Sequence, residues 1–116
     1  MHELGFAEQI LNCVEEEARR HGARKALRVK LRMGKYSGLE KASLFFCLEA
    51  ISAGTLMEGA EIEIEETAAE WFCANCGRYS SDGYAEPICP ACGGKAVLTE
   101  GMELYVKEIE LDDDEG

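Results

Sequence analysis

The sequence of 116 residues predicts an α+β fold in which two helices accompany a three-stranded sheet and a four-cysteine module is inserted before the last strand. Two segments carry apolar residues at the spacing of an amphipathic helix, and three others alternate apolar and charged residues as half-buried strands do. One intervening segment instead concentrates cysteine, glycine and proline. The length suits one small domain with an appendage, because two domains with full cores need a longer chain.

The first helix is predicted between Leu4 and His21, where apolar residues recur three or four positions apart. Gly22 is well placed to end it, because glycine readily adopts the left-handed conformation of a helix C-terminus. The next segment, ALRVKLRM at residues 26–33, sets apolar residues against basic ones. It therefore predicts a strand with one buried face and one basic face.

A second helix is predicted over residues 39–53, with Ser37 as its candidate N-cap. Its apolar residues cover a wide arc, so we expect most of this helix to be buried. The segment AEIEIEE at residues 60–66 then alternates isoleucine with glutamate and predicts a strand whose outer face is acidic. Because the first strand is basic on its outer face, we expect the two strands to be neighbours in the sheet.

The last strand is predicted in ELYVKEIEL, at residues 103–111. Two cysteines outside the inserted module, Cys13 and Cys47, lie near apolar residues of the predicted helices. A free cysteine in such surroundings behaves as a small apolar residue, so both are expected to pack in the core.

The overall composition excludes some classes of partner and favours one compartment. With 12 basic and 23 acidic residues, the formal net charge of −11 repels phosphate backbones, so nucleic acid is not expected as a partner. The start of the sequence resembles no secretion signal, and no apolar run is long enough to span a membrane, so we expect the cytoplasm. Thiols stay reduced there, so six cysteines favour metal binding over disulfides.

The strongest motif pairs Cys73 with Cys76 and Cys89 with Cys92, in the sequences CANCG and CPACG. A glycine after each pair lets the backbone turn tightly at positive φ, so that both thiolates of a pair face one centre. Four thiolates in this arrangement are typical zinc ligands, and the bound ion would order a segment that has few aliphatic residues. A rubredoxin-like iron site is the alternative with the same ligands, and disulfides or redox pairs are a further alternative.

The N-terminal residues Met1, His2 and Glu3 form a second candidate metal site. A histidine at position two can offer a terminal amine, a backbone amide and its imidazole in fused chelate rings, which suits Ni(II) or Cu(II). Glu3 can add a carboxylate or a further amide nitrogen. The alternative is that this histidine is simply solvated near the chain terminus.

Three blocks of the sequence resemble the HypA/HybF family of nickel-incorporation proteins. They are MHELGFAEQIL at the start, GKYSGLEKASLFFCLEAISAGTLMEGAEIEIEE in the middle, and the C-x-x-C…C-P-x-C-G pattern near the end. Together they cover nearly the whole chain. The resemblance implies that His2 and Glu3 match the nickel-binding residues of the family. It also implies that the zinc ligands are Cys73, Cys76, Cys89 and Cys92.

The resemblance further implies a domain organisation. A nickel-binding domain of two helices packed on the three-stranded sheet is expected over residues 1–69 and 100–111. A zinc-ribbon-like module is expected over residues 70–99. The acidic tail at residues 112–116 has no assigned role in the family, and its own composition predicts disorder.

The implied function is that of a metallochaperone, which carries structural Zn(II) and transfers Ni(II) as its cargo. With a GTPase partner called HypB, such a protein passes nickel to the precursor of the [NiFe]-hydrogenase large subunit. Some members also serve urease, which implies urease accessory proteins as further partners. We expect a monomer or weak homodimer without membrane insertion.

Two other functions fit parts of the sequence. A zinc-ribbon module that only recognises nucleic acid or a protein surface would need no metal transfer, but a nucleic-acid reader is expected to have a basic ribbon. Arg78 and Lys95 are the only basic residues between Trp71 and Leu98. An electron-transfer protein with iron in the four-thiolate site is the other alternative. Neither a nucleophile–base pair nor a phosphate-binding loop is recognisable, so we do not expect an enzyme.

Overall fold

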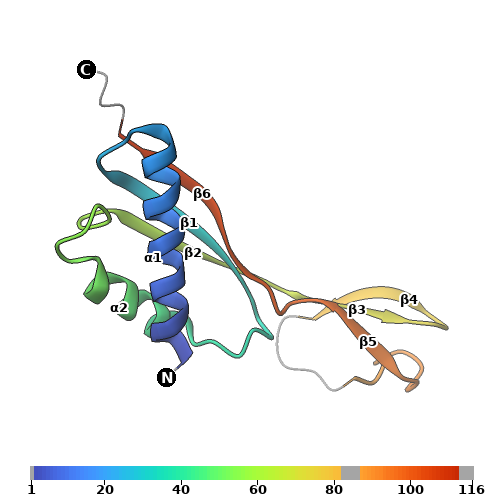
Figure 1. The fold of residues 1–116 in the computed structure, drawn as a ribbon. Coiled ribbons are helices and arrows are strands. Elements are labelled where there is room, and N and C mark those ends of the chain that lie inside the picture. Colours follow the sequence, from blue (N-terminus) through green and yellow to red (C-terminus); the bar gives the residue numbers. More distant parts are fainter. Residues whose placement is uncertain (1, 82–86, 113–116) are drawn as a thin grey trace. The chain divides into compact units, whose positions relative to one another are not determined.

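The computed structural model describes residues 2–81 and 87–112, and for His2 the backbone only. Figure 1 shows the helices and strands of these residues along the chain. In order they are α1 (His2–His21), β1 (Ala26–Gly34), α2 (Lys41–Ser52), β2 (Glu61–Thr67), β3 (Ala69–Cys73), β4 (Gly77–Ser81), β5 (Ala96–Glu100) and β6 (Leu104–Leu111). No helix within the described residues is both long and apolar enough to cross a membrane.

The chain divides into two compact units. Unit 1 comprises Met1–Leu31, Leu39–Glu65 and Tyr105–Gly116, whereas unit 2 comprises Arg32–Gly38 and Glu66–Leu104. One three-stranded sheet has the order β2-β1-β6, and a second has the order β4-β3-β5. The predicted α+β class, with two helices and a four-cysteine cluster inserted before the last strand, is confirmed.

Unit 1 is built from the two helices and the first sheet. Both helices lie on the same side of this sheet (Figure 1), and α1 buries the stripe of apolar residues that its periodicity predicts. The buried apolar residues of this unit are Ala7, Ile10, Val14, Ala18, Ala26, Val29, Leu31, Leu44, Leu48, Met57, Ala60 and Ile64. The core therefore lies between the helices and the sheet.

The solvent-facing side of the sheet carries the predicted rows of opposite charge. β1 and β2 are neighbours, as their charges predict. Glu63 of β2 forms ion pairs with Arg28 at 3.1 Å and with Lys30 at 3.9 Å. Its negative charge raises the pKa of Arg28. Lys107 of β6 lies 3.4 Å from Glu65. Such partly exposed pairs contribute little to stability, but they favour this strand order over others.

The second helix differs from its prediction in two respects. It begins at Lys41, and its N-cap is Glu40, whose carboxylate accepts a hydrogen bond from the Ser43 N–H at 3.1 Å. Ser37 instead belongs to the preceding turn, where its N–H donates to the Gly34 carbonyl. The prediction of Ser37 as the cap is therefore wrong, because the glycine at position 38 adopts positive φ and delays the helix.

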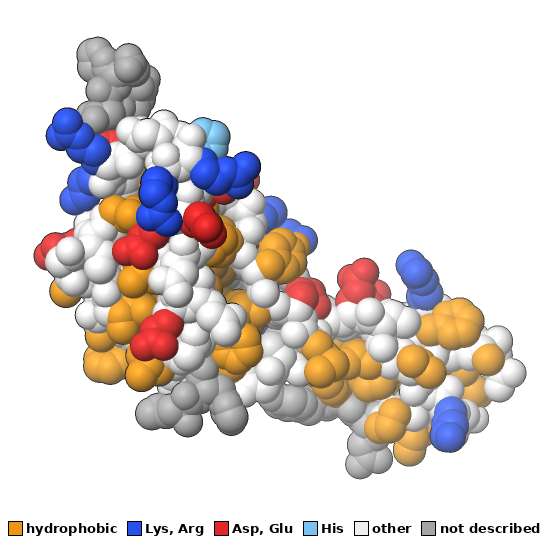
Figure 2. Space-filling model, in the orientation of Figure 1, with side chains coloured by type: hydrophobic (Ala, Val, Ile, Leu, Met, Phe, Trp, Pro, Cys, Tyr) orange, Lys and Arg blue, Asp and Glu red, His pale blue; other side chains and the backbone are white. Residues whose placement is uncertain are grey.

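Less of α2 is buried than its composition predicts. Only Leu44, Leu48 and Ser52 are buried, and these residues form a single stripe four positions apart. Phe46, which lies on a different face of the helix, is 72% exposed. Figure 2 shows apolar side chains gathered on the surface over this helix.

The prediction that Cys13 packs in the core is also wrong. Its side chain is exposed, whereas that of Cys47 is partly buried. The buried stripe of α1 passes through Ile10 and Val14, and Cys13 precedes Val14 by one position. One position turns a side chain by about 100° around the helix axis, which is enough to bring it out of the core.

At the end of β6, Asp112 forms hydrogen bonds with the segment before β1. Its carboxylate accepts from the backbone N–H groups of Arg24 and Lys25, both at 3.2 Å, and its own N–H donates to the Lys25 carbonyl. The other residues of the predicted acidic tail, 113–116, lie outside the described residues. Their predicted disorder stays a prediction.

Unit 2 contains three short strands that the sequence patterns do not predict. β3 pairs antiparallel with both β4 and β5. Its core is small and largely aromatic, with Trp71 3% exposed, and comprises Ala69, Trp71 and Ala96 with Tyr36, Tyr79 and Leu98 packed against them. The Trp71 ring contacts Tyr36 edge-on, with centroids 5.5 Å apart, and stacks with Tyr79 at 6.4 Å. These aromatic pairs compensate in part for the scarcity of aliphatic residues.

Glu103 fixes the entry to β6 within unit 2. Its carboxylate accepts hydrogen bonds from the Thr67 hydroxyl and the Gly101 N–H, each at 2.8 Å. Burial alone would raise the pKa of Glu103, but hydrogen bonds from its own N–H, Thr67 and Gly101, together with the charge of Arg32, outweigh burial and lower it. The ionised carboxylate therefore stabilises the folded state.

We expect Glu103→Gln to lower the stability of unit 2 by about 1 kcal/mol at pH 7. The glutamine amide has one oxygen that can accept, so its NH₂ group must face either the Thr67 hydroxyl or the Gly101 N–H, and that hydrogen bond is lost. Because the pKa of Glu103 is lower in the folded state, its carboxylate stabilises the protein at pH values above its unfolded-state pKa. This contribution is lost as the pH falls through the folded-state value, so the difference between variant and wild type should shrink on acidification. Urea unfolding followed by Trp71 fluorescence measures it. Glu100→Gln, on an exposed neighbouring glutamate, is the control and should leave the midpoint unchanged.

Candidate metal centre

Strand pairing brings the four cysteines of unit 2 together. Cys73 ends β3, and its register partner Gly77 begins β4, so the tight turn between them places Cys76 beside Cys73. Cys73 also pairs with Ala96 of β5. The loop before β5 carries Cys89 and Cys92, and it is closed by a bridge between Ile88 and Lys95. The second cysteine pair therefore lies at the same end of the sheet as the first.

The sulfur atoms have the spacing of a tetrahedral metal site. All four Sγ atoms lie within 4.8 Å of one another, and the Cys73 and Cys92 sulfurs are 3.7 Å apart. Zn–S bonds of about 2.3 Å in a regular tetrahedron require sulfurs about 3.8 Å apart. All six cysteines are free thiols, which argues against the disulfide alternative. The donor set and its spacing therefore fit a four-thiolate metal ion.

The backbone around the cluster adopts the conformation that the motif predicts. Gly77 and Gly93, the glycines after the two pairs, have φ of 94° and 76°. In the second turn the Gly93 N–H donates to the Cys89 carbonyl, and the Cys89 N–H donates to the Gly94 carbonyl. The Gly94 N–H also points at the Cys92 sulfur, 3.4 Å away. Such N–H donors stabilise negative charge on a ligating thiolate.

The thiols of the cluster differ in acidity because they form different hydrogen bonds with one another and with the backbone. The pKa of Cys92 is lowered to about 7, first by the hydrogen bond from the Gly94 N–H and then by those from the Cys73 and Cys76 thiols. The pKa of Cys76 is raised to about 12, because its hydrogen bonds to Cys92 and Cys89 hold its proton. The Gly94 N–H thus favours the thiolate form of Cys92, which is the form that binds a metal.

The burial of the sulfur ligands is uneven. Cys73 and Cys89 are buried, whereas Cys76 and Cys92 are exposed, so each pair contributes one ligand from the interior and one from the surface. Within the described residues, no other group of three or more cysteine, histidine or carboxylate side chains converges closely enough to hold a metal.

The N-terminal candidate site is only partly described. The side chain of His2 lies outside the described residues, although its backbone begins α1. The Glu3 carboxylate accepts a hydrogen bond from the Glu40 N–H at 2.9 Å. This contact joins the first turn of α1 to the N-cap of α2. The N-terminal segment is thereby tied to a second element of unit 1.

Glu40 is a residue near this site that the sequence patterns did not single out. Its N–H donates to Glu3, and its own carboxylate accepts from the N–H and hydroxyl of Ser43 at 3.1 and 3.3 Å. The local pattern gives little sign of this cap, because glutamate is not among the residues preferred at a helix N-cap. It gives no sign of the contact with Glu3, which is 37 residues away in the sequence.

Comparison with known proteins shows that the chain is similar to one protein family over most of its length. The family model described as "Hydrogenase/urease nickel incorporation, metallochaperone, hypA" matches residues 1–111. The chain is 39% identical over 114 residues to the hydrogenase maturation factor HypA of Psychromonas ingrahamii, covering 97% of this chain and 99% of that protein. It is 36% identical over 112 residues to HypA of Rhodobacter capsulatus, with 96% and 99% covered.

Solved structures support the fold independently. The solution structure of the Ni metallochaperone HypA from Helicobacter pylori matches with a TM-score of 0.68 and 22% sequence identity, and the match covers 94% of this chain and 96% of that one. A second HypA solution structure gives a TM-score of 0.71, also at 22% identity, and covers 96% of each chain.

Proposed function

Because the chain belongs to the HypA family of hydrogenase and urease nickel-incorporation metallochaperones, we propose that it binds Ni(II) at its N-terminus and delivers it for the maturation of [NiFe]-hydrogenase. The recipient is the precursor of the large subunit, and a HypB-type GTPase assists the transfer. Urease accessory proteins are further candidate partners. The protein holds and passes on a metal ion in the cytoplasm, and it catalyses no reaction of its own.

We assign nickel to His2 and Glu3. The helix geometry supports this site, because the first four N–H groups of a helix have no acceptor within it. Since α1 begins at His2, an amide nitrogen of its first turn can release its proton to water and bind nickel without breaking a helix hydrogen bond. The helix dipole disfavours a cation at this end, but the Glu3 carboxylate offsets that effect.

We assign zinc to Cys73, Cys76, Cys89 and Cys92. The single observation that carries this assignment is the convergence of four sulfur atoms within 4.8 Å of one another. Zinc supplies no redox chemistry at such a closed site and acts as a structural cross-link. Iron in the same four thiolates is the rival assignment, and a red colour with visible absorption bands would reveal it. Metal analysis of the purified protein separates the two ions.

The Glu3→Gln variant tests the nickel assignment against a purely structural role. Glutamine keeps an oxygen that can accept from the Glu40 N–H, but it removes the carboxylate charge. Because the variant keeps the backbone amide nitrogen of position 3 and loses only the carboxylate charge, we expect nickel affinity to fall by roughly tenfold, the lower end of the range for changes around a metal site. The thermal midpoint of unfolding should stay unchanged.

Calorimetric nickel titration and thermal unfolding of the same preparations give both readouts. Glu8→Gln, on an exposed glutamate of α1, is the matched control for the lost charge. Loss of thermal stability with unchanged nickel affinity would show that Glu3 only joins the two helices.

A further inference from the structure

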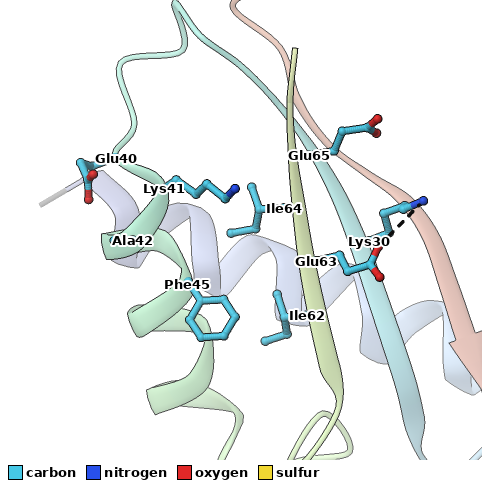
Figure 3. A pocket seen from close by; sticks show the side chains of 9 residues that line it. All are labelled: Lys30, Glu40, Lys41, Ala42, Phe45, Ile62, Glu63, Ile64 and Glu65. Carbon is cyan, nitrogen blue, oxygen red and sulfur yellow. Dashed lines mark ion pairs between the residues drawn. The ribbon is translucent and has the colours of Figure 1, made fainter.

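Unit 1 carries a surface groove of about 860 Å³ between α2 and β2. Figure 3 shows Phe45 and Lys41 of α2 reaching toward Ile62 and Ile64 of β2 across this groove. The groove is lined by Lys30, Glu40, Lys41, Ala42, Phe45, Ile62, Glu63, Ile64 and Glu65. Its volume lies within the range of ligand-binding pockets.

The lining shows that the groove runs along the edge of the sheet. Four consecutive residues of β2, from Ile62 to Glu65, contribute to it. Successive side chains of a strand point to opposite faces, so a cavity that meets all four must lie beside the strand. Within the described residues, β2 is an edge strand of its sheet. Its outward N–H and C=O groups are therefore available to another strand.

Some charged side chains of the groove form ion pairs within the protein, whereas others do not. Glu63 is paired with Arg28 and Lys30, and Glu65 lies 3.4 Å from Lys107. The Lys41 ammonium has no ion-pair partner among the described residues. Phe45, which lies one turn from Lys41, is 39% exposed. The helix side of the groove therefore offers an apolar surface and the Lys41 ammonium, while the neighbouring Glu40 carboxylate accepts hydrogen bonds from Ser43.

We propose that this groove binds an extended peptide that adds to β2 as a fourth strand. Alternate residues of such a peptide face the helix side. One of them is apolar and lies beside Ile62 and Phe45, and the next but one is acidic and lies beside Ile64, within reach of Lys41. The intervening residues are small and polar, because they neighbour the ion pairs of Glu63 and Glu65. This inference goes beyond metal delivery and does not depend on the nickel site.

Two capped pentapeptides probe both strand directions, one with the order Thr-Val-Thr-Asp-Thr and one with the order Thr-Asp-Thr-Val-Thr. The zinc-loaded full chain, labelled with nitrogen-15 and free of nickel, is titrated with each peptide and followed by NMR. We expect saturable shifts of the amide signals of β2 and of α2 near Phe45 for one direction. Replacing the aspartate of that peptide with lysine should weaken binding about tenfold.

Lys41→Glu should reverse this preference, so that the lysine peptide binds more tightly than the aspartate peptide. Lys25→Glu is the matched control, because it changes the net charge equally at an exposed residue outside the groove. The control should retain the preference of the wild type. An unchanged preference in Lys41→Glu would overturn the proposal.

Backbone methylation tests the strand addition itself. Alternate N–H groups of a strand point to opposite edges. N-methylation of the valine and aspartate residues therefore blocks one edge of the peptide, and N-methylation of the threonines blocks the other. Only one of the two methylated peptides should lose binding.

Three results would contradict the proposal. They are no saturable binding of either aspartate peptide at millimolar concentration, equal effects of both methylation patterns, and binding that leaves the β2 signals unmoved. A fourth result would also contradict it. If the β2 signals shift with protein concentration alone and neither peptide reverses that change, a second copy of the chain occupies the edge instead of a peptide.

Discussion

Replacing Cys73 with serine is expected to release the proposed zinc ion and to unfold unit 2. A serine hydroxyl does not replace a thiolate as a zinc ligand, and three remaining sulfurs leave the site open to water. Structural zinc contributes on the order of 10 kcal/mol to the folding of small modules. The apolar core of unit 2 is built around three buried residues, Ala69, Trp71 and Ala96. We do not expect that core to compensate for the loss of zinc.

Zinc content and the fluorescence of the single tryptophan, Trp71, measure this outcome together. Trp71 is 3% exposed in the folded unit, so unfolding should shift its emission to longer wavelength. The far-ultraviolet circular dichroism of α1 and α2 should persist, because the core of unit 1 contains none of the four cysteines.

Cys13→Ser is the matched control, since Cys13 is an exposed thiol on α1 outside the cluster. It should keep one zinc ion per chain and the emission of the wild type. A Cys73→Ser protein that retains stoichiometric zinc and a buried tryptophan would refute the assignment of the cluster. Acidification should also release zinc from the wild type, because protons then compete with zinc for the thiolates.

Replacing His2 with alanine is expected to abolish stoichiometric nickel binding and to leave the zinc content unchanged. Alanine removes the imidazole that the proposed chelate needs, although the amine and amide nitrogens remain. Loss of a group that only orients a ligand costs about 10- to 100-fold in metal affinity. Loss of the ligand itself should therefore exceed about 100-fold.

The sequence offers its own control for this variant, because His21 is the only other histidine. His21 lies at the end of α1, where its Nε2 is 3.1 Å from a Glu17 carboxylate oxygen. His21→Ala should bind one nickel ion per chain as the wild type does. Titration of both variants, with nickel and zinc quantified in each, separates the two sites. Normal nickel binding by His2→Ala would place the site elsewhere.

The sequence alone predicted the elements whose signals are local. The apolar spacing of α1 and the alternation in β1 and β2 depend on residues close together in the chain, and the structure confirms these elements. The opposite charges of two strands predicted that they are neighbours, which the Arg28–Glu63 ion pair supports. The C-x-x-C spacing likewise predicted the tight turns at Gly77 and Gly93, because a short motif determines its own geometry.

Local patterns did not reveal which helix faces are exposed. Phe46 and Cys13 are as apolar as their buried neighbours, yet both reach the surface. Each helix packs on its sheet through one stripe, and only the position of the sheet selects that stripe. The short strands of unit 2 escaped prediction for a related reason, since their residues alternate weakly and their pairing depends on Trp71 and the cysteine loops.

The sequence by itself thus predicted the fold class, the cluster of four cysteines and the family. Only the tertiary structure decided which distant groups meet. The pairing of Cys73 with Ala96 brings the second cysteine pair to the first, and the Glu3–Glu40 hydrogen bond joins two helices across 37 residues. These contacts depend on closing long loops against conformational entropy. Their outcome is set by packing throughout each unit, whereas a motif or a periodic pattern depends only on its own few residues.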